Sequence, residues 1–204
     1  MVKAIVNDFA ENCYIIAANN EAYVIDPGSN YQAMKKLIEK EQLTLKGVLL
    51  THGHYDHISG INDLLEHFDA TIYVHRKERD FLFDHNLNLS GQMDKIFRVK
   101  DKHRIESIDE TKTFSLGNDM IKVVFTPGHT RGGVTFHYQN YLFTGDALFR
   151  ESIGRTDLPT ASENDLLKSI HTLLNTFDDN TICYPGHGHF TTIAHEKMHN
   201  PYID

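Results

Sequence analysis

A short segment that combines three histidines with one aspartate carries the most informative chemistry in the sequence. The segment reads THGHYDH, residues 51–57, and it directly follows the apolar run Val-Leu-Leu at 48–50. Because such a run is typical of a strand, the segment brings several imidazole nitrogens and one carboxylate to the end of a strand. Zinc and other first-row divalent metals favour this mixture of nitrogen and oxygen ligands in open catalytic sites. The segment therefore predicts a metal-binding site.

Three glycine-containing turns elsewhere in the chain carry further candidate ligands. His129 ends the sequence TPGH, His187 ends YPGH, and Asp146 ends FTGD. Each turn comes after a strand-like segment, so each places its histidine or aspartate just beyond a strand. Four such elements in one chain favour a shared metal centre over a chance pattern.

The composition is that of an ordinary soluble globular chain. The 204 residues are 40% hydrophobic and 24% charged, and the formal net charge is −8. No run of Lys or Arg interrupts the acidic balance, so nothing supports a surface for nucleic acid or for an anionic membrane. We therefore expect no nucleic-acid partner and no membrane partner.

The sequence also predicts a cytoplasmic protein. No apolar stretch is long enough to cross a bilayer, and the N-terminus lacks the layout of a signal peptide. The two cysteines, Cys13 and Cys183, each lie in a strand-like segment. We expect both to be reduced thiols packed in the core rather than a disulfide or metal ligands.

Hydrophobic patterning predicts many short strands and a few amphipathic helices. In the first half, the expected strands are 3–6, 13–17, 22–25, 47–50 and 72–74, and the expected helices are 31–40, 58–68 and 76–83. In the second half, the expected strands are 112–116, 120–126, 133–138, 141–144 and 181–184, and the expected helices are 163–176 and a short one at the end. Residues 84–103 show no pattern and suggest a mobile loop.

This order of elements predicts an α/β protein. Two strand-rich halves, each followed by helices, indicate two sheets packed face to face with helices outside. The sequence contains no tandem repeat, low-complexity tract or linker. We therefore expect one domain over residues 1–204.

On these motifs the chain resembles the metallo-β-lactamase superfamily. Its T-H-x-H-x-D-H, P-G-H-T, G-D and P-G-H-G elements occur in the family's order. The resemblance implies an αββα sandwich of two mixed β-sheets flanked by helices, with a binuclear metal site at one edge of the sheets. Within the superfamily the chain is most similar to the short bacterial form of glyoxalase II (hydroxyacylglutathione hydrolase), on the segment 145–159 and the ending Asn-Pro-Tyr at 200–202.

The resemblance implies how two divalent metal ions would be held. It assigns His52, His54 and His129 to the first ion, Asp56, His57 and His187 to the second, and Asp146 to both. Zinc is the expected metal, with iron or manganese as alternatives. Two such ions lower the pKa of a bound water toward neutrality. Asp56 is the expected catalytic residue, because it would orient that nucleophile and carry a proton afterwards.

The resemblance further implies hydrolysis of a thioester or ester, such as S-lactoylglutathione or a related thiol ester. Longer glyoxalase II enzymes carry a C-terminal domain that supplies much of the glutathione pocket, and the short segment after His187 leaves no room for one. Their glutathione-binding lysine and tyrosine correspond here to Arg155 and Asp157, and a further tyrosine corresponds to His189. These three are the candidate substrate-binding residues, although a structural ion pair is an equal alternative for Arg155 and Asp157.

Other functions share parts of the pattern. Persulfide dioxygenases use one iron and carry a Gly-Arg-Thr-Asp stretch, but they end in P-A-H-D where this chain has P-G-H-G. Lactonases and RNA-processing nucleases share the ligand set, and the acidic surface argues against a nuclease. The best-known β-lactamase subclass has a cysteine at the position of Asp146. The acyl group, the thiol carrier, the metal in the cell and the oligomeric state are left open.

Overall fold

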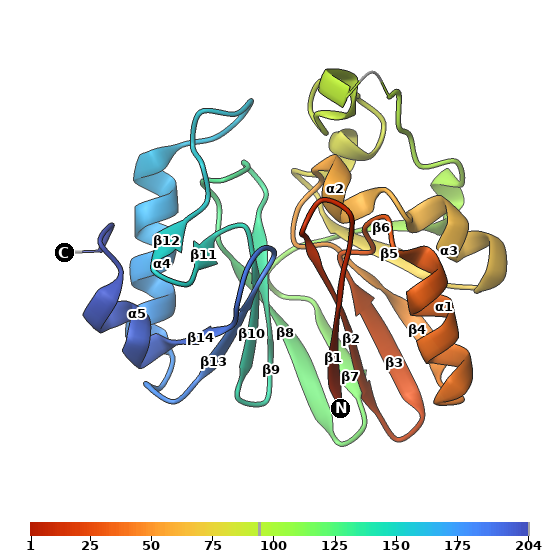
Figure 1. The fold of residues 1–204 in the computed structure, drawn as a ribbon, viewed down its shortest axis with the longest axis horizontal. Helices are drawn as coiled ribbons and strands as arrows, with labels where there is room; N and C mark the ends of the chain where they lie inside the picture. The colour runs from red at the N-terminus through yellow and green to blue at the C-terminus, as the bar shows by residue number, and fades with distance from the viewer. Residues whose placement is uncertain (94, 204) are drawn as a thin grey trace.

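Two six-stranded sheets lie face to face in the computed structural model, which describes residues 1–93 and 95–203 (Figure 1). The first sheet has the order β1-β2-β3-β4-β5-β6 and the second has the order β14-β13-β10-β9-β8-β7. Strands β1 to β3 pair antiparallel while β3 to β6 pair parallel, and in the second sheet only β10 and β13 pair parallel. Both sheets are therefore mixed, as predicted.

The strand bounds follow the chain in two groups. The first sheet contains β1 Val2–Val6, β2 Asn12–Ala18, β3 Glu21–Ile25, β4 Thr44–Leu49, β5 Thr71–His75 and β6 Ile105–Ile108. The second contains β7 Thr113–Leu116, β8 Asp119–Phe125, β9 Val134–Tyr138, β10 Tyr141–Gly145, β13 Ile182–Pro185 and β14 Thr191–Thr192. A small hairpin adds β11 Leu148–Phe149 and β12 Ser152–Ile153.

Helices cover the outer face of each sheet, which completes four layers (Figure 1). The helices are α1 Tyr31–Lys40, α2 Tyr55–Ile58, α3 Ile61–His67, α4 Glu163–Thr176 and α5 Ile193–His199, with 3₁₀ turns η1 Arg79–Leu82, η2 Ser90–Met93 and η3 Lys102–Arg104. Helices α1 and α3 lie against the first sheet, and α4 and α5 lie against the second. Among the described residues, no helix has both the length and the apolar character of a membrane span.

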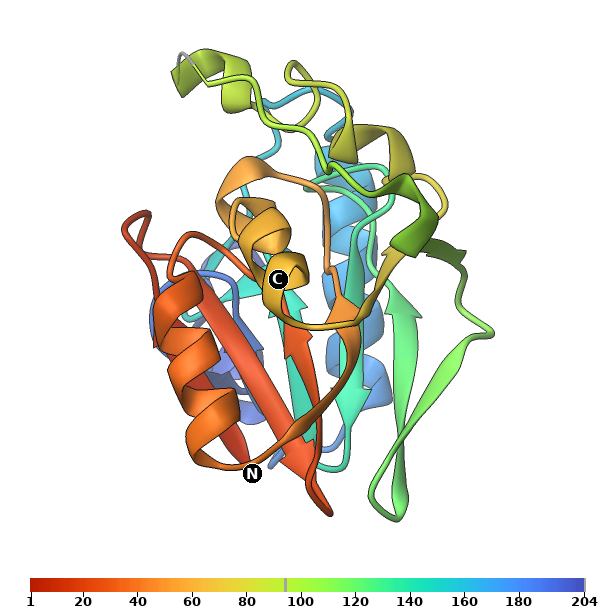
Figure 2. The same ribbon diagram turned by 90° about the vertical axis from the view of Figure 1, so that its right-hand side faces the viewer.

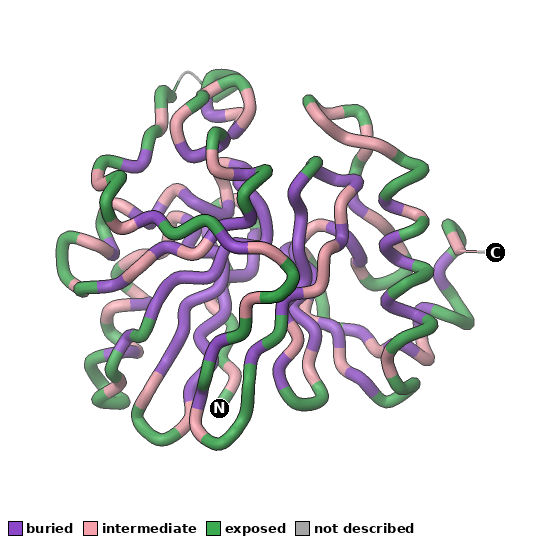
Figure 3. The backbone as a smooth tube through the Cα atoms, turned by 180° about the vertical axis from the view of Figure 1, so that it is seen from behind, coloured by how far each residue is buried: buried purple, intermediate pink, exposed green. Residues whose placement is uncertain are grey.

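Period-two alternation explains how one strand serves two apolar layers. In β2, Cys13 and Ile15 pack toward the helices, whereas Tyr14 and Ile16 pack toward the second sheet. A third apolar cluster lies between the second sheet and α4. Because β2 is buried on both faces, it reads as a continuous apolar run rather than as an alternating one. Figure 3 shows the buried strands at the centre and the exposed turns around them.

Most of the predicted elements are confirmed, and the helices 31–40 and 163–176 have the predicted bounds. The helix predicted over 58–68 is confirmed as α3 but begins later, at Ile61, because Ile58 belongs to the separate helix α2. The N–H of Gly60 donates to the carbonyl of Pro27 at 2.9 Å instead of continuing the helical ladder. Strands β6, β11, β12 and β14 were not predicted, because each is only two to four residues long. Cys13 and Cys183 are buried free thiols, as predicted.

The segment predicted as a patternless loop at 84–103 contains η2 and the start of η3 and is anchored to the domain. Asn88 and Ser90 are fully buried, and the Asn88 amide donates to the carbonyl of Phe81 at 2.8 Å. The N–H of Val99 donates to the carbonyl of Leu82 at 2.9 Å. Asp94, within the predicted loop, lies outside the described residues. Figure 2 shows this yellow-green segment above the strand ends.

Candidate metal centre

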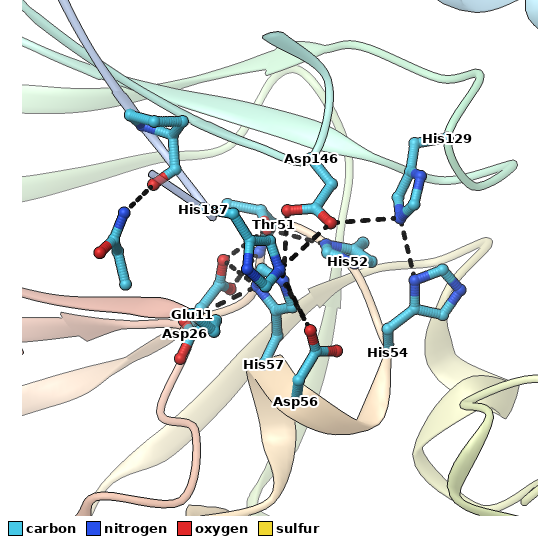
Figure 4. A network of polar contacts seen from close by, with 12 residues as sticks. Glu11, Asp26, Thr51, His52, His54, Asp56, His57, His129, Asp146 and His187 are labelled. Atoms are coloured by element: carbon cyan, nitrogen blue, oxygen red, sulfur yellow. Dashed lines mark hydrogen bonds and ion pairs between the residues drawn. The ribbon is translucent and has the colours of Figure 1, made fainter. Parts of the chain in front are cut away.

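The predicted ligands come together where the strands of both sheets end. His52 and His54 follow β4, Asp56 and His57 lie on α2, His129 follows β8, Asp146 follows β10 and His187 follows β13. Figure 4 shows these side chains pointing toward one another from different elements. The structure therefore brings all seven predicted ligands to one place.

The side chains form two groups of three. One ligand atom from each of His52, His54 and His129 lies within 4.8 Å of the others, and the same holds for Asp56, His57 and His187. In the first group, His54 Nδ1 and His129 Nε2 are 3.0 Å apart. In the second, Asp56 Oδ2 is 3.2 Å from His187 Nε2 and 3.8 Å from His57 Nε2. Each group has the size of a metal site.

Asp146 lies between the two groups. Its Oδ1 atom is 3.3 Å from His57 Nε2, and its Oδ2 atom is 3.6 Å from both His129 Nε2 and His187 Nε2. One carboxylate therefore faces both sets of nitrogens, which is the position that a bridging ligand needs.

Several buried nitrogen and oxygen atoms of the centre have no hydrogen-bond partner, which shows whether metal ions fit there. Within the described residues, His52 Nε2, His57 Nε2 and Asp146 Oδ1 are buried and form no hydrogen bond. Leaving a buried polar group unsatisfied costs about 1–3 kcal/mol. A divalent cation would satisfy these lone pairs, and a set of imidazoles with carboxylates is one that zinc and iron accept. The residues present fit the metal ions that the sequence predicts.

Hydrogen bonds on the far side of the rings fix their orientation. His57 Nδ1 donates to Asp26 Oδ2 at 3.0 Å, His129 Nδ1 to the carbonyl of Arg155 at 2.9 Å, and His187 Nδ1 to the carbonyl of Ala10 at 3.1 Å. A ring that donates from Nδ1 presents an unprotonated Nε2 to the centre when it is neutral. Such partners hold metal-binding histidines in one tautomer and raise their basicity.

Asp26 supports the centre and was not identified from the sequence. Its Oδ1 atom accepts the N–H of Thr51 at 2.8 Å, and its Oδ2 atom accepts both the Thr51 hydroxyl and His57 Nδ1. Thr51 Oγ1 in turn lies 3.1 Å from His52 Nδ1. Asp26 thus orients one histidine of each group. In the sequence, the only local indication of this role is that Asp26 is an acidic residue directly after the predicted strand 22–25.

The turn that carries His187 is held by the opposite sheet. The Tyr14 hydroxyl donates to the carbonyl of Pro185 at 2.6 Å, and the Asn12 amide donates to the same carbonyl at 3.0 Å. Both residues lie on β2 of the first sheet. His187 therefore keeps its place beside Asp56 only while the two sheets stay packed together.

The electrostatics of the centre differ between the two histidine groups. Burial lowers the pKa of His52 well below its usual value and lowers the pKa of His54 to about 3. Burial would raise the pKa of Asp146, but the neighbouring His57 outweighs it and holds the pKa well below the usual range. The His52 and His54 rings are therefore neutral. In the second group burial opposes protonation, but Asp146 raises the pKa of His57 well above its usual value and a hydrogen bond to Asp56 raises the pKa of His187. These two rings would release their protons on binding a metal.

A cleft of about 520 Å³ opens over this centre. Its lining includes the candidate ligands His54, Asp56, His129, Asp146 and His187, the apolar side chains Phe9, Tyr55, Leu89, Met93, Phe149, Ile153 and Leu158, and Arg155. Arg155 donates from Nε and Nη2 to the two carboxylate oxygens of Asp157, each at 2.7 Å. Of the three predicted substrate contacts, Arg155 lines the cleft, and Asp157 is exposed and bonded to Arg155.

His189 is exposed and does not line this cleft. It borders a separate groove together with Tyr14, Tyr184 and Phe190. The positive φ of Gly188, 77°, turns the chain between His187 and His189. Adjacent sequence positions therefore end on different surfaces.

Comparison with known proteins identifies the family. The model of the metallo-β-lactamase superfamily matches residues 6–187. A probable metallo-hydrolase of Streptococcus pyogenes serotype M6 is 40% identical over 206 residues, which cover 98% of this chain and 89% of that protein. The hydroxyacylglutathione hydrolase GloC of Haemophilus influenzae is 34% identical over 209 residues, which cover 98% of this chain and 95% of that protein.

Solved structures agree with the family match. The crystal structure of BLEG-1, a B3 metallo-β-lactamase, is 36% identical, with a TM-score of 0.92 and coverage of 100% of this chain and 99% of that one. The structure of TTHA1623 in a di-iron-bound form is 29% identical, with a TM-score of 0.86 and full coverage of both chains. The four-layer fold and the two histidine-rich groups at its sheet edge are thus those of a metal-dependent hydrolase family, and the chain belongs to the metallo-β-lactamase superfamily.

Proposed function

We propose that this protein is a binuclear metal-dependent hydrolase that cleaves a thioester to an acid and a thiol, with S-lactoylglutathione or a related thiol ester as substrate. The observation that carries the proposal is the convergence of two three-residue groups on the shared carboxylate of Asp146. The likeness to a hydroxyacylglutathione hydrolase supports the thioester. The likeness to a di-iron-bound structure supports two metal ions.

In this proposal the two groups hold one ion each. His52, His54 and His129 would hold the first ion, Asp56, His57 and His187 would hold the second, and Asp146, which faces both groups, would contribute to each. Zinc is the proposed metal, and the mixed nitrogen and oxygen donors also admit iron or manganese. When bound, the ions would supply Lewis acidity and lower the pKa of a water molecule.

Asp56 provides the proton chemistry. Its side chain is 23% exposed and lines the cleft, so it reaches the space that water and substrate share. It accepts a hydrogen bond from the attacking water and orients that water toward the carbonyl. After the attack it carries a proton toward the departing thiolate. His187, 3.2 Å away, holds the carboxylate in place from the second group.

The walls of the cleft bind the rest of the substrate. The apolar side chains hold the acyl group and exclude bulk water, which strengthens the electrostatic interactions inside. Arg155 binds a carboxylate on the thiol portion, remote from the reacting carbonyl. Asp157 orients Arg155 through two charge-assisted hydrogen bonds and leaves Nη1 of the guanidinium for the ligand.

Hydrolysis of a β-lactam is a second candidate, because the backbone superposes on a B3 metallo-β-lactamase with a TM-score of 0.92. Both reactions need a water directed at a carbonyl, and they differ in the bond that breaks. A thioester releases a thiolate, whereas a β-lactam opens a strained amide. Direct comparison of substrates separates the two candidates.

The first prediction concerns substrate class. Given equal protein and zinc, S-lactoylglutathione or another thioester should be turned over with a kcat/KM at least about tenfold above that for a β-lactam, a lactone or glutathione persulfide. Thiol release, ring opening and oxygen uptake are the three measurements. Oxygen-dependent consumption of the persulfide, or preferential opening of the β-lactam, would contradict the thioesterase.

The second prediction concerns metal content. Protein purified without chelator should contain close to two metal equivalents per chain by elemental analysis. Replacement of His57 or His187 by Ala should remove one equivalent and leave the other, because both side chains are assigned to the second ion, in the group that contains Asp56. A wild-type chain that saturates with a single iron at every zinc concentration would refute the binuclear centre.

The third prediction concerns Asp56→Asn. The amide cannot accept and return a proton, so kcat should fall by roughly 10²–10⁴-fold, while the melting temperature changes little. The measurement is steady-state turnover of protein whose metal content has been counted. A folded, metal-loaded variant that keeps near-full turnover would exclude Asp56 from the proton transfer.

The fourth prediction separates substrate binding from a structural ion pair at Arg155. Arg155→Ala should raise KM for an anionic thioester about tenfold or more, as expected for a charged hydrogen bond of about 1.5–3 kcal/mol. KM for a neutral thioester with the same acyl group should change little. Equal losses on both substrates, or a loss of metal or of folding stability, would favour the structural role.

A further inference from the structure

A buried carboxylate outside the ligand set joins two of the loops that form the centre. Glu78 lies between β5 and η1 and is fully buried. Its Oε2 atom accepts the N–H of Gly53 at 3.0 Å, and its Oε1 atom accepts the N–H of Gly132 at 2.8 Å. These partners are 25 and 54 residues away along the chain. One side chain therefore ties together two distant turns.

The two turns carry all of the first histidine group. Gly53 stands between His52 and His54, and Gly132 stands three residues after His129. The ring nitrogens that face each other across these turns, His54 Nδ1 and His129 Nε2, are 3.0 Å apart. Their spacing depends on how far apart the turns are held, and Glu78 bonds to both turns.

We propose that Glu78 is a positioning residue that fixes the separation of His54 and His129 and so sets the affinity and geometry of the first metal site. The inference rests on the ligand assignment of the proposed function. It does not require Glu78 to touch the metal or the substrate. Its carboxylate acts through the backbone of Gly53 and Gly132.

The residues around Glu78, Gly53 and Gly132 are closely packed. A Cβ atom added to Gly53 would lie 2.3 Å from Cβ of Phe81, and one added to Gly132 would lie 2.8 Å from Cγ of Glu78. Phe81 is itself fixed to Glu78, because its N–H donates to the Glu78 carbonyl at 3.0 Å. A displacement of the Glu78 side chain is therefore passed to both turns rather than absorbed by a gap.

The chemistry of the side chain also points to a specific role. A carboxylate loses its hydration in the interior, and burial raises the pKa of Glu78 to about 7. An apolar residue would be easier to bury but would leave two N–H groups without acceptors. Two acceptor oxygens on one rigid group satisfy both turns at once.

The experiment compares Glu78→Gln with a matched control, Glu196→Gln. Glutamine keeps the size of the side chain. Its NH₂ group, however, cannot accept a hydrogen bond, so the N–H of either Gly53 or Gly132 loses its acceptor. Glu196 is also fully buried and bonds to Thr191, Asn200 and the N–H of Glu151, in a part of the fold away from the centre. Both substitutions therefore remove one buried acceptor, and only Glu78→Gln disturbs the histidine turns.

The readouts are stepwise zinc affinity against a competing chelator and the absorption spectrum of the cobalt-substituted protein. A His54→Ala variant identifies which binding step belongs to the first group. In Glu78→Gln that step should weaken by roughly 10–100-fold, as expected when the partner that orients a metal ligand is lost. The zinc-binding step of the second group should be unchanged, and the cobalt absorption bands should shift. Glu196→Gln should match wild type in both zinc-binding steps and in the cobalt spectrum.

Two outcomes would overturn the inference: wild-type affinities and cobalt bands in Glu78→Gln, or an equal loss in Glu196→Gln. If Glu78→Gln does not fold, Gly132→Ala replaces it, because the added methyl group meets Oε1 of Glu78 at 2.9 Å and displaces the same contact. That variant should weaken the same binding step, and unchanged affinity would refute the role. If Glu78→Gln weakens only the first zinc-binding step but the wild-type protein does not hydrolyse thioesters, the proposed function is rejected and the role of Glu78 is retained.

Discussion

The structure depends on one constraint, the burial of nitrogen and oxygen lone pairs that the described residues do not satisfy. His52 Nε2, His57 Nε2 and Asp146 Oδ1 are enclosed at the sheet edge without hydrogen bonds. Such a cluster would destabilise a fold that held it for no purpose. It is tolerated where a cation replaces the missing partners, as in the metal-dependent family to which the chain belongs. Because the folded chain already holds these lone pairs in place, the cation would bind without further ordering of its ligands.

Keeping those lone pairs aimed at one point requires a second set of contacts. Asp26 orients His57 directly and His52 through Thr51, so one carboxylate serves both histidine groups. Backbone carbonyls of Arg155 and Ala10 accept hydrogen bonds from the far sides of the His129 and His187 rings. These acceptors come from turns that lie far apart in sequence. The centre is therefore only as rigid as the packing that brings the turns together.

That packing comes from three apolar layers between the sheets and their helices. Strand β2 contributes to two of them, and its Asn12 and Tyr14 also hold the His187 turn of the opposite sheet. Strand β2 thus links the core to the centre in addition to the strands that end at the ligands. Substitutions that loosen the packing between the sheets should therefore displace His187 relative to Asp56 and His57.

The sequence by itself determined the residue types that end the strands, the helices at 31–40 and 163–176, and the family, because these features are local patterns of three to fourteen residues. The roles of Asp26 and Glu78 were decided only by tertiary structure. Their partners lie 25 to 54 residues away, and no periodicity connects such positions. The same holds for His189, which local turn geometry directs to a different surface from His187. Which side chains support a site depends on how distant turns meet, and that is set by the packing of the two sheets.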